Sequence, residues 1–187
     1  MEPLEFISFL GKVEKLKSNT RHSITSDSVP ETVAAHSWRM AMMALLLKEQ
    51  LKDVDMQKVL HMCIIHDIGE AVTGDIPSFD KTQENEEVEK KAIRKLLEEL
   101  PEDLCKEFTA LFDEMDALET KEAKVYKALD RMEAVLQHNE APISSWLPLE
   151  YELQMTYGVE DAKVDPWLTA LREQLKKDTL QKIEKNS

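Results

Sequence analysis

The sequence is poor in glycine, proline and aromatic residues. Among its 187 residues are 4 glycines and 7 prolines, and aromatic side chains make up 6% of the chain. Sheet proteins need many tight turns, which glycine and proline supply, so this composition argues against a β-rich fold. Leu, Glu, Lys, Ala and Met, which favour helices, are abundant instead. We therefore predict an all-α fold.

The chain also lacks any run of about 18 consecutive apolar residues, which a membrane-spanning helix would need. Its first residues carry acidic side chains and have neither the basic start nor the small-residue cleavage site of a signal peptide. The two cysteines, Cys63 and Cys105, are too far apart in sequence for a zinc-type pair, and Cys63 lies in an apolar run typical of a buried thiol. We expect a cytoplasmic protein without a membrane partner.

Positive charge is scarce. Lys and Arg number 24 against 37 Asp and Glu, which gives a net charge of -13. Binding of a nucleic-acid polymer depends on neutralising many phosphates, so this balance argues against such a partner. A small anionic substrate remains compatible with the charge, provided that a metal ion or a few basic side chains offset the repulsion locally.

Apolar residues at helical spacing predict a bundle of helices. We expect helices over residues 3–17, 30–51, 56–71, 84–99, 101–118 and 122–137, a short helical segment over 149–157, and a last helix after 166. The stretches 18–30 and 72–80 are predicted to be loops, and loops of this length are often functional. With no repeat or linker evident, we predict one domain over 1–187, with a core at about 31–140 and a helical appendage at about 141–187.

Ionisable residues stand where these helices should face the core. His36 heads the stripe Met40, Met43, Leu47, and His66 and Asp67 end a largely apolar helix. Asp130 flanks a further apolar stripe, formed by Val125, Leu129, Met132 and Leu136.

A buried carboxylate without a partner costs several kcal/mol, and a divalent cation can satisfy carboxylates and neutral imidazoles together. Each residue alone has an ordinary explanation. A single histidine on an apolar face is more often a hydrogen-bonded core residue, and Asp130 could pair with Lys127 or Arg131. The combined pattern on three helices indicates a metal site inside the bundle.

Three segments at these positions resemble the HD-domain superfamily of metal-dependent phosphohydrolases: ETVAAHSWRMAMMALLL, HMCIIHDIGEAVTGDIP and KALDRMEAVLQ. The second is particularly similar to the 5'-deoxynucleotidases, which share the pattern HD, two residues, E, and then GD followed by an apolar residue and Pro. The resemblance implies that His36, His66, Asp67 and Asp130 bind one divalent ion. Manganese, cobalt, iron, nickel or zinc suits such ligands, with magnesium as a further option.

The resemblance also implies roles for four other residues. Glu70 and Asp75 match catalytic carboxylates that manage protons of the attacking water or the leaving group. Arg21 matches a phosphate-binding arginine, whose guanidinium can hold a phosphate with two parallel hydrogen bonds. His22 occupies the place of a tryptophan that helps to select the sugar in the bacterial enzymes. Without the metal site, Glu70 would be an ordinary residue at a helix end, and Asp75 and Arg21 would be ordinary loop residues.

We interpret the chain as a phosphomonoesterase that acts on nucleoside or deoxynucleoside 5'-monophosphates, and the resemblance suggests a homodimer. Two alternatives stay open: another HD-type substrate, such as a phosphodiester, an alarmone or a nucleoside triphosphate, and a non-catalytic helical protein whose metal only fixes the fold. Trp146, Tyr151 and Tyr157 could stack on a base or serve in packing. His61 and His138 match no family role and are expected to be structural or exposed.

Overall fold

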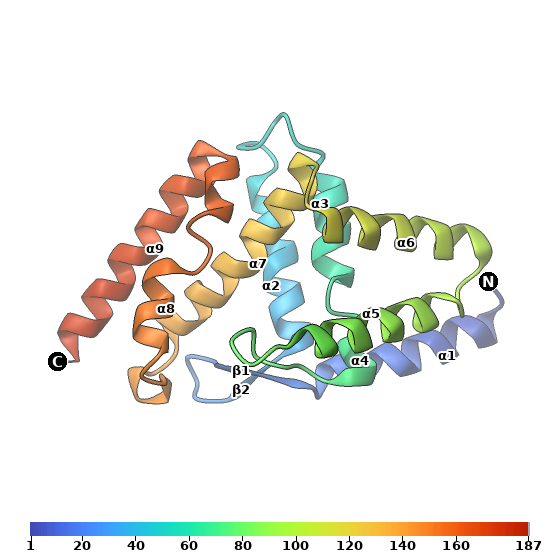
Figure 1. Cartoon of the computed structure of the whole chain (residues 1–187), viewed down its shortest axis with the longest axis horizontal. Helices are drawn as coiled ribbons and strands as arrows, with labels where there is room; N and C mark the ends of the chain where they lie inside the picture. The colour runs from blue at the N-terminus through green and yellow to red at the C-terminus, as the bar shows by residue number, and fades with distance from the viewer. Residues whose placement is uncertain (187) are drawn as a thin grey trace.

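The computed structural model describes residues 1–186. Its other helices surround one long central helix, α7 (Lys121–Glu140). On the side of the amino terminus lie α1 (Pro3–Val13), α5 (Gln83–Leu97) and α6 (Glu102–Ala117). On the side of the carboxyl terminus lie α8 (Glu150–Thr156) and α9 (Pro166–Lys185) (Figure 1). Short 3₁₀ helices complete the chain: η1 (Glu14–Lys17), η2 (Ile143–Ser145) and η3 (Asp161–Val164).

The main core forms where α7 packs against α2 (Val33–Leu47) and α3 (Met56–Ile65). The apolar stripes predicted for these helices do face inward: Met40, Cys63, Leu129 and Met132 are fully buried. The Thr120 side chain caps α7 by accepting a hydrogen bond from Ala123 N (3.2 Å), and Asp55 caps α3 in the same way. The bundle predicted from the composition is thus confirmed, and its core holds together the helices that carry the candidate metal ligands.

The predicted loop at 18–30 is wrong in part, because it contains most of a small hairpin. Strands β1 (Thr20–Ile24) and β2 (Pro30–Thr32) pair antiparallel, with Thr20 opposite Thr32 and Ile24 opposite Pro30. The following helix therefore begins at Val33 instead of Pro30, with Thr32 as its cap. Pro30 is tolerated because a two-stranded ribbon has only edge strands.

The predicted helix over 56–71 is also shorter than expected. Helix α3 ends at Ile65, His66 to Gly69 form a turn, and a short α4 (Glu70–Thr73) follows. Gly69 lies against α5 so closely that a Cβ atom there would be 2.6 Å from Ile93 Cγ1. The turn thus depends on glycine, and it presents His66, Asp67 and Glu70 from the end of the helix.

The other predicted helices are confirmed, with ends that differ by a few residues. Helix α1 has no buried residue, so its apolar side chains Leu4, Phe6, Ile7 and Leu10 remain exposed. Cys63 is buried, as expected, and Cys105 is half-buried. In residues 1–186, no helix is both long enough and apolar enough to cross a membrane.

Candidate metal centre

Four of the predicted ligands meet between α2, the turn after α3, and α7. The His36 and His66 rings lie 5.3 Å apart between centroids. His66 Nε2 is 2.9 Å from Asp67 Oδ2, and His36 Nε2 is 3.3 Å from Asp130 Oδ1. One ligand atom each from His36, His66 and Asp67 lies within 4.8 Å of the other two, a spacing that could hold one ion. The structure therefore brings the four residues together as the sequence pattern predicts.

The facing atoms of this cluster are buried without hydrogen bonds. His36 Nε2, His66 Nε2 and Asp67 Oδ2 have no hydrogen-bond partner among the described residues. Leaving a buried polar atom unsatisfied costs about 1–3 kcal/mol, so such atoms rarely gather in one place without a shared ligand. Two imidazole nitrogens and a carboxylate oxygen are donors that divalent transition metals prefer. The donor set thus fits a divalent cation.

The other nitrogen of each histidine is held so that Nε2 keeps its lone pair. His66 Nδ1 lies 3.0 Å from the Cys63 carbonyl, to which it donates a hydrogen bond. His36 Nδ1 is hydrogen-bonded to the Glu133 carboxylate, which Arg39 Nε also contacts at 2.7 Å. Such partners of metal-binding histidines fix the tautomer and the ring orientation. Glu133 is therefore a positioning residue for His36.

Glu133→Gln is expected to weaken divalent-metal affinity by about 10–100-fold, the usual effect of removing such a partner. The neutral amide no longer stabilises the Nδ1–H form of His36 as a carboxylate does. Metal titration with a chromophoric chelator as competitor measures the change. Glu140→Gln is the matched control, because Glu140 also pairs with Arg39 but is exposed and does not contact His36. Equal affinity in both variants would contradict the role.

Arg21, on β1, lies beside the metal cluster. Its Nη1 is 3.5 Å from Asp67 Oδ2 and its Nε is 3.3 Å from Glu31 Oε2. Burial lowers the pKa of Arg21, but the carboxylates of Asp67, Glu133 and Glu31 outweigh burial and raise it, so the residue stays charged. Arg21 also lines the cavity, where its guanidinium can donate hydrogen bonds to an anion.

Glu70 and Asp75 line the same cavity as Asp67. Burial, followed by the charges of Asp67 and Asp75, raises the pKa of Glu70 to about 9. Burial also raises the pKa of Asp75, although Arg21 opposes this. Gly74 has a φ of 76°, a left-handed conformation that glycine adopts readily, and it turns the chain so that Asp75 faces the cavity. A carboxyl group with a raised pKa next to a metal cluster is a candidate for proton transfer.

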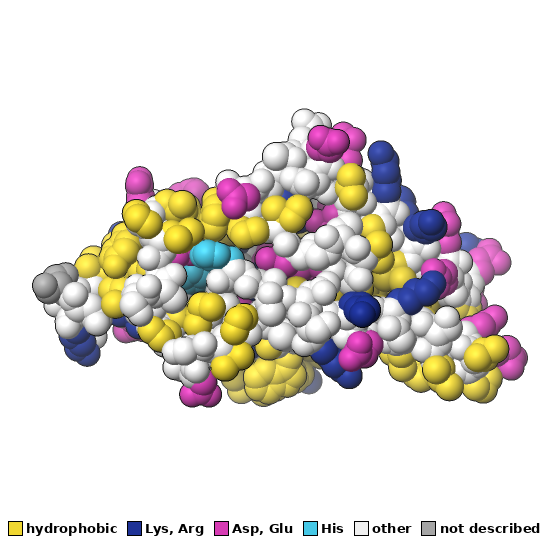
Figure 2. Space-filling model, turned by 90° about the horizontal axis from the view of Figure 1, so that it is seen from below, with side chains coloured by type: hydrophobic (Ala, Val, Ile, Leu, Met, Phe, Trp, Pro, Cys, Tyr) yellow, Lys and Arg dark blue, Asp and Glu magenta, His cyan; other side chains and the backbone are white. Residues whose placement is uncertain are grey.

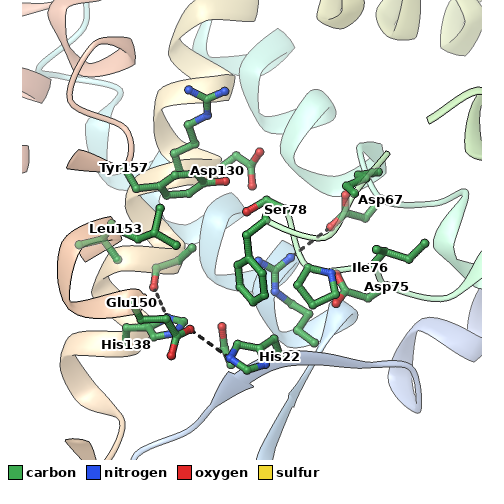
Figure 3. A pocket seen from close by; sticks show the side chains of 18 of the residues that line it. His22, Asp67, Asp75, Ile76, Ser78, Asp130, His138, Glu150, Leu153 and Tyr157 are labelled. Carbon is green, nitrogen blue, oxygen red and sulfur yellow. Dashed lines mark hydrogen bonds and ion pairs between the residues drawn. The ribbon is translucent and has the colours of Figure 1, made fainter. Parts of the chain in front are cut away.

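One cavity of about 530 Å³ adjoins this cluster. Arg21, Asp67, Glu70, Asp75 and Asp130 line it, whereas His36 and His66 are buried and do not. Figure 2 shows histidine and acidic side chains side by side in the hollow on this face. In Figure 3, Asp67 and Asp75 lie on one side of the cavity, and Leu153, His138 and Glu150 lie on the other. Besides Arg21, three cations line it: Lys81, Lys127 and Arg131. They give the acidic protein the local positive charge that an anionic ligand needs.

The sequence pattern of the HD domain matches residues 13–172. The chain belongs to the HD-domain family. Its matched region extends well beyond the core predicted at about 31–140, and it includes both the hairpin with Arg21 and helix α8. The resemblance inferred from the three sequence segments is confirmed.

Relatives of this HD-domain protein include 5'-deoxynucleotidases. It is 34% identical over 144 residues to 5'-deoxynucleotidase HDDC2 of Dictyostelium discoideum, and the aligned residues cover 72% of this chain and 74% of the relative. It is 32% identical over 139 residues to the Homo sapiens protein of the same name, covering 73% and 67%. A crystal structure of a "Predicted metal-dependent phosphohydrolase" from Magnetospirillum magnetotacticum superposes with a TM-score of 0.81 at 30% identity, covering 96% of this chain and 93% of the other.

Several residues of the HD-domain site were missed by the sequence analysis. Glu133 follows Asp130 by three residues, so it lies one helical turn further on α7, and a charged residue between Met132 and Val135 was a usable signal. The cavity also contains His138 and Glu150, which come from elements that only the fold brings near, and Tyr157, one of the aromatic residues considered for stacking on a base. His61 is exposed, as expected, whereas His138 lines the cavity. Trp146 is buried by packing and contacts the Tyr151 ring at 5.3 Å.

Proposed function

We propose that this HD-domain protein is a divalent-metal-dependent phosphohydrolase that releases phosphate from nucleoside or deoxynucleoside 5'-monophosphates. One observation carries the proposal: the unpartnered, buried atoms His36 Nε2, His66 Nε2 and Asp67 Oδ2 meet beside Arg21, and both Asp67 and Arg21 line a cavity of about 530 Å³. Pockets for small molecules span roughly 300–1,000 Å³, so a nucleotide fits this size class. The names of the deoxynucleotidase relatives support the monophosphate substrate.

His36, His66, Asp67 and Asp130 would hold the ion. Manganese, cobalt, iron, nickel and zinc all suit two imidazoles and two carboxylates, and magnesium is a weaker match because it prefers oxygen ligands. When bound, such an ion polarises a phosphoryl oxygen and lowers the pKa of water. The side chains of His36 and His66 are buried and those of Asp67 and Asp130 are 15% exposed at the cavity, so bulk water has limited access to the group.

The chain's own residues then bind the phosphate and move the proton. Arg21 donates its N–H groups to phosphate oxygens, and its contacts with Glu31 and Asp67 hold the guanidinium in place. Glu70 accepts a proton from the attacking water through Oε2, a buried oxygen that has no hydrogen-bond partner among the described residues. A cation nearby favours the ionised form of Glu70 that this step requires. Asp75 lies close enough to assist with the leaving-group oxygen.

The rest of the cavity is suited to a nucleoside. His22 follows Arg21 on β1, and its ring meets the edge of Phe79 at 5.5 Å. We assign His22 to the part of the substrate next to the phosphate, and Phe79 and Tyr157 to flat contact with a base. We also propose that residues 1–187 form one HD domain. In it the appendage at about 141–187 contributes to the cavity, because Glu150, Leu153 and Gln154 of α8 line the wall beside Tyr157.

The experiment that tests this function is a panel of ribo- and deoxyribonucleoside mono-, di- and triphosphates, offered to metal-stripped protein with single metals added back. Phosphate release confined to monophosphates is the expected result. Release from phosphodiesters, alarmones or triphosphates would move the substrate assignment to another HD-type reaction. Complete inactivity with metal bound would favour the non-catalytic alternative.

We further propose that the protein is a homodimer, which the outer face of α2 supports. Trp38, Met42, Leu45 and Leu46 follow one another at helical spacing, and Trp38 and Leu46 are 66% and 74% exposed. Contiguous apolar side chains on a surface mark an interaction site more often than isolated ones do. A second copy of the chain would cover this stripe.

Leu46→Glu is therefore expected to halve the molar mass measured by light scattering, because two introduced charges would meet across the twofold interface. Leu180→Glu is the control, since Leu180 is an exposed leucine on α9, away from this stripe. An unchanged mass for Leu46→Glu, or a wild-type protein that is already monomeric, would contradict the dimer through α2.

A further inference from the structure

A second group of metal-binding side chains meets on the opposite wall of the cavity. His22 from β1, His138 from α7 and Glu150 from α8 each present one ligand atom, and all three atoms lie within 4.8 Å of one another. His138 Nε2 is 2.7 Å from Glu150 Oε1, and His22 Nε2 is 3.0 Å from the same oxygen. Figure 3 shows these three residues together, away from Asp67 and Asp75. None of them belongs to the predicted metal centre.

The three side chains are positioned by further contacts. His138 Nδ1 lies 3.0 Å from the Ala134 carbonyl, and the indole of Trp146 donates a hydrogen bond to the His138 carbonyl at 3.1 Å. Glu150 Oε2 accepts a hydrogen bond from Leu147 N at 2.6 Å, which leaves Oε1 directed at the histidines. Glu150 is almost fully buried. Partners of this kind orient metal ligands and keep the facing nitrogen free.

A neutral His138 ring does not have enough N–H groups for the two acceptors that it contacts. The Ala134 carbonyl and an ionised Glu150 can only accept hydrogen bonds, yet both contact His138, and a neutral imidazole has one N–H. His22 Nε2 approaches Glu150 Oε1 at 3.0 Å without making a hydrogen bond. A divalent cation shared by both Nε2 atoms and Oε1 satisfies all three and leaves the His138 Nδ1–H for Ala134. The close approach of His66 Nε2 to Asp67 Oδ2 in the first cluster is of the same kind.

A further unpartnered polar atom lies on α8, one helical turn after Glu150. Gln154 follows Glu150 by four residues, so the two side chains share a face of the helix, and both line the cavity. Gln154 is only 5% exposed, and its Oε1 is buried without a hydrogen-bond partner among the described residues. A buried amide oxygen without a partner costs free energy unless a cation or a donor reaches it.

We propose that His22, His138 and Glu150 form a second divalent-cation site, with the Gln154 amide oxygen as a neighbouring fourth donor. Two imidazoles and one carboxylate are a ligand set that zinc uses at sites that keep an open position. That open position faces the cavity, because all four residues line it. Under the proposed function, His22 then contacts the substrate through the ion.

Metal counting tests this site without any substrate. Metal-stripped protein is equilibrated with Zn²⁺, freed of loosely bound ion by gel filtration, and measured by elemental analysis. The wild type is expected to retain two equivalents of zinc. Glu150→Gln and Asp67→Asn should each retain one, from different sites, and the double variant none. Glu152→Gln, which changes an exposed glutamate on the same helix, should retain two.

A single equivalent in the wild type would overturn the second site, as would two equivalents in Glu150→Gln. His22→Gln provides a second test, because His22 is partly exposed and outside the core, and it should also lower the zinc content to one equivalent. Circular dichroism confirms that each variant is folded. Because the readout is bound metal, failure of this inference is distinguishable from failure of the proposed hydrolysis.

Discussion

Asp67→Asn is expected to lower kcat/KM for phosphate release by at least about 100-fold. Loss of a residue that only orients a metal ligand costs about 10–100-fold, and loss of a ligand itself should cost more. Asp67 faces the candidate metal with a buried oxygen that has no hydrogen-bond partner among the described residues, and the same oxygen contacts Arg21. An amide carries no charge to balance the ion, and its NH₂ group would oppose a cation directly. Activity should fall together with the metal retained at this centre.

Asp80→Asn provides the matched control, because Asp80 is an exposed aspartate on the following loop and does not line the cavity. Its kinetics should equal those of the wild type. Elemental analysis and initial rates, both at saturating manganese, measure the two effects. Full activity in Asp67→Asn with the ion lost would show that the metal centre is not the catalytic one.

The four proposed ligands could be singled out because each is an ionisable residue at or beside a position where a helix should be apolar. His36 interrupts an inward stripe on α2, and His66 and Asp67 end an apolar run, so local periodicity identifies them. The pattern on three helices indicated a metal site, but it did not assign all four side chains to one ion, because this depends on how α2, α3 and α7 cross. The resemblance to the HD family supplied that step, together with Arg21, Glu70 and Asp75.

The hairpin was missed because its strands carry weak signals. The five residues of β1 mix polar and apolar side chains without clear alternation, and β2 contains Pro30. The hairpin matters for the site, since it places Arg21 and His22 at the cavity. The end of α3 at Ile65 was hidden for a different reason: the close approach of Ile93 to Gly69 comes from a distant segment.

The opposite wall of the cavity could not be derived from the sequence either. His138 and Glu150 are separated by 12 residues, and His22 is 116 residues before His138 and 128 before Glu150, so no local spacing connects them. Each residue has an ordinary explanation when read alone. Only the packing of α7 and α8 beside the hairpin brings their ligand atoms together.

Glu70→Gln is expected to lower kcat by about 10²–10⁴-fold, the range that proton transfer by a positioned side chain contributes. The bound ion and KM should change little, because the amide has the same shape and Glu70 is not one of the four metal ligands. Glu84→Gln, an exposed change on α5, serves as the matched control. Initial rates over a range of substrate concentrations separate kcat from KM.

Stability measurements distinguish a catalytic effect from a folding defect. Burial and the neighbouring carboxylates raise the pKa of Glu70 to about 9, so folded protein holds this proton more tightly than unfolded protein does. In metal-stripped wild type, the contribution of Glu70 to the free energy of unfolding is complete below the unfolded pKa and falls as pH rises toward 9. Glu70→Gln removes that decline, so the variant should be at least as stable as the wild type at pH 8. A folded Glu70→Gln variant with unchanged kcat would exclude Glu70 as the proton acceptor. The kcat of Asp75→Asn would then decide whether Asp75 takes the proton.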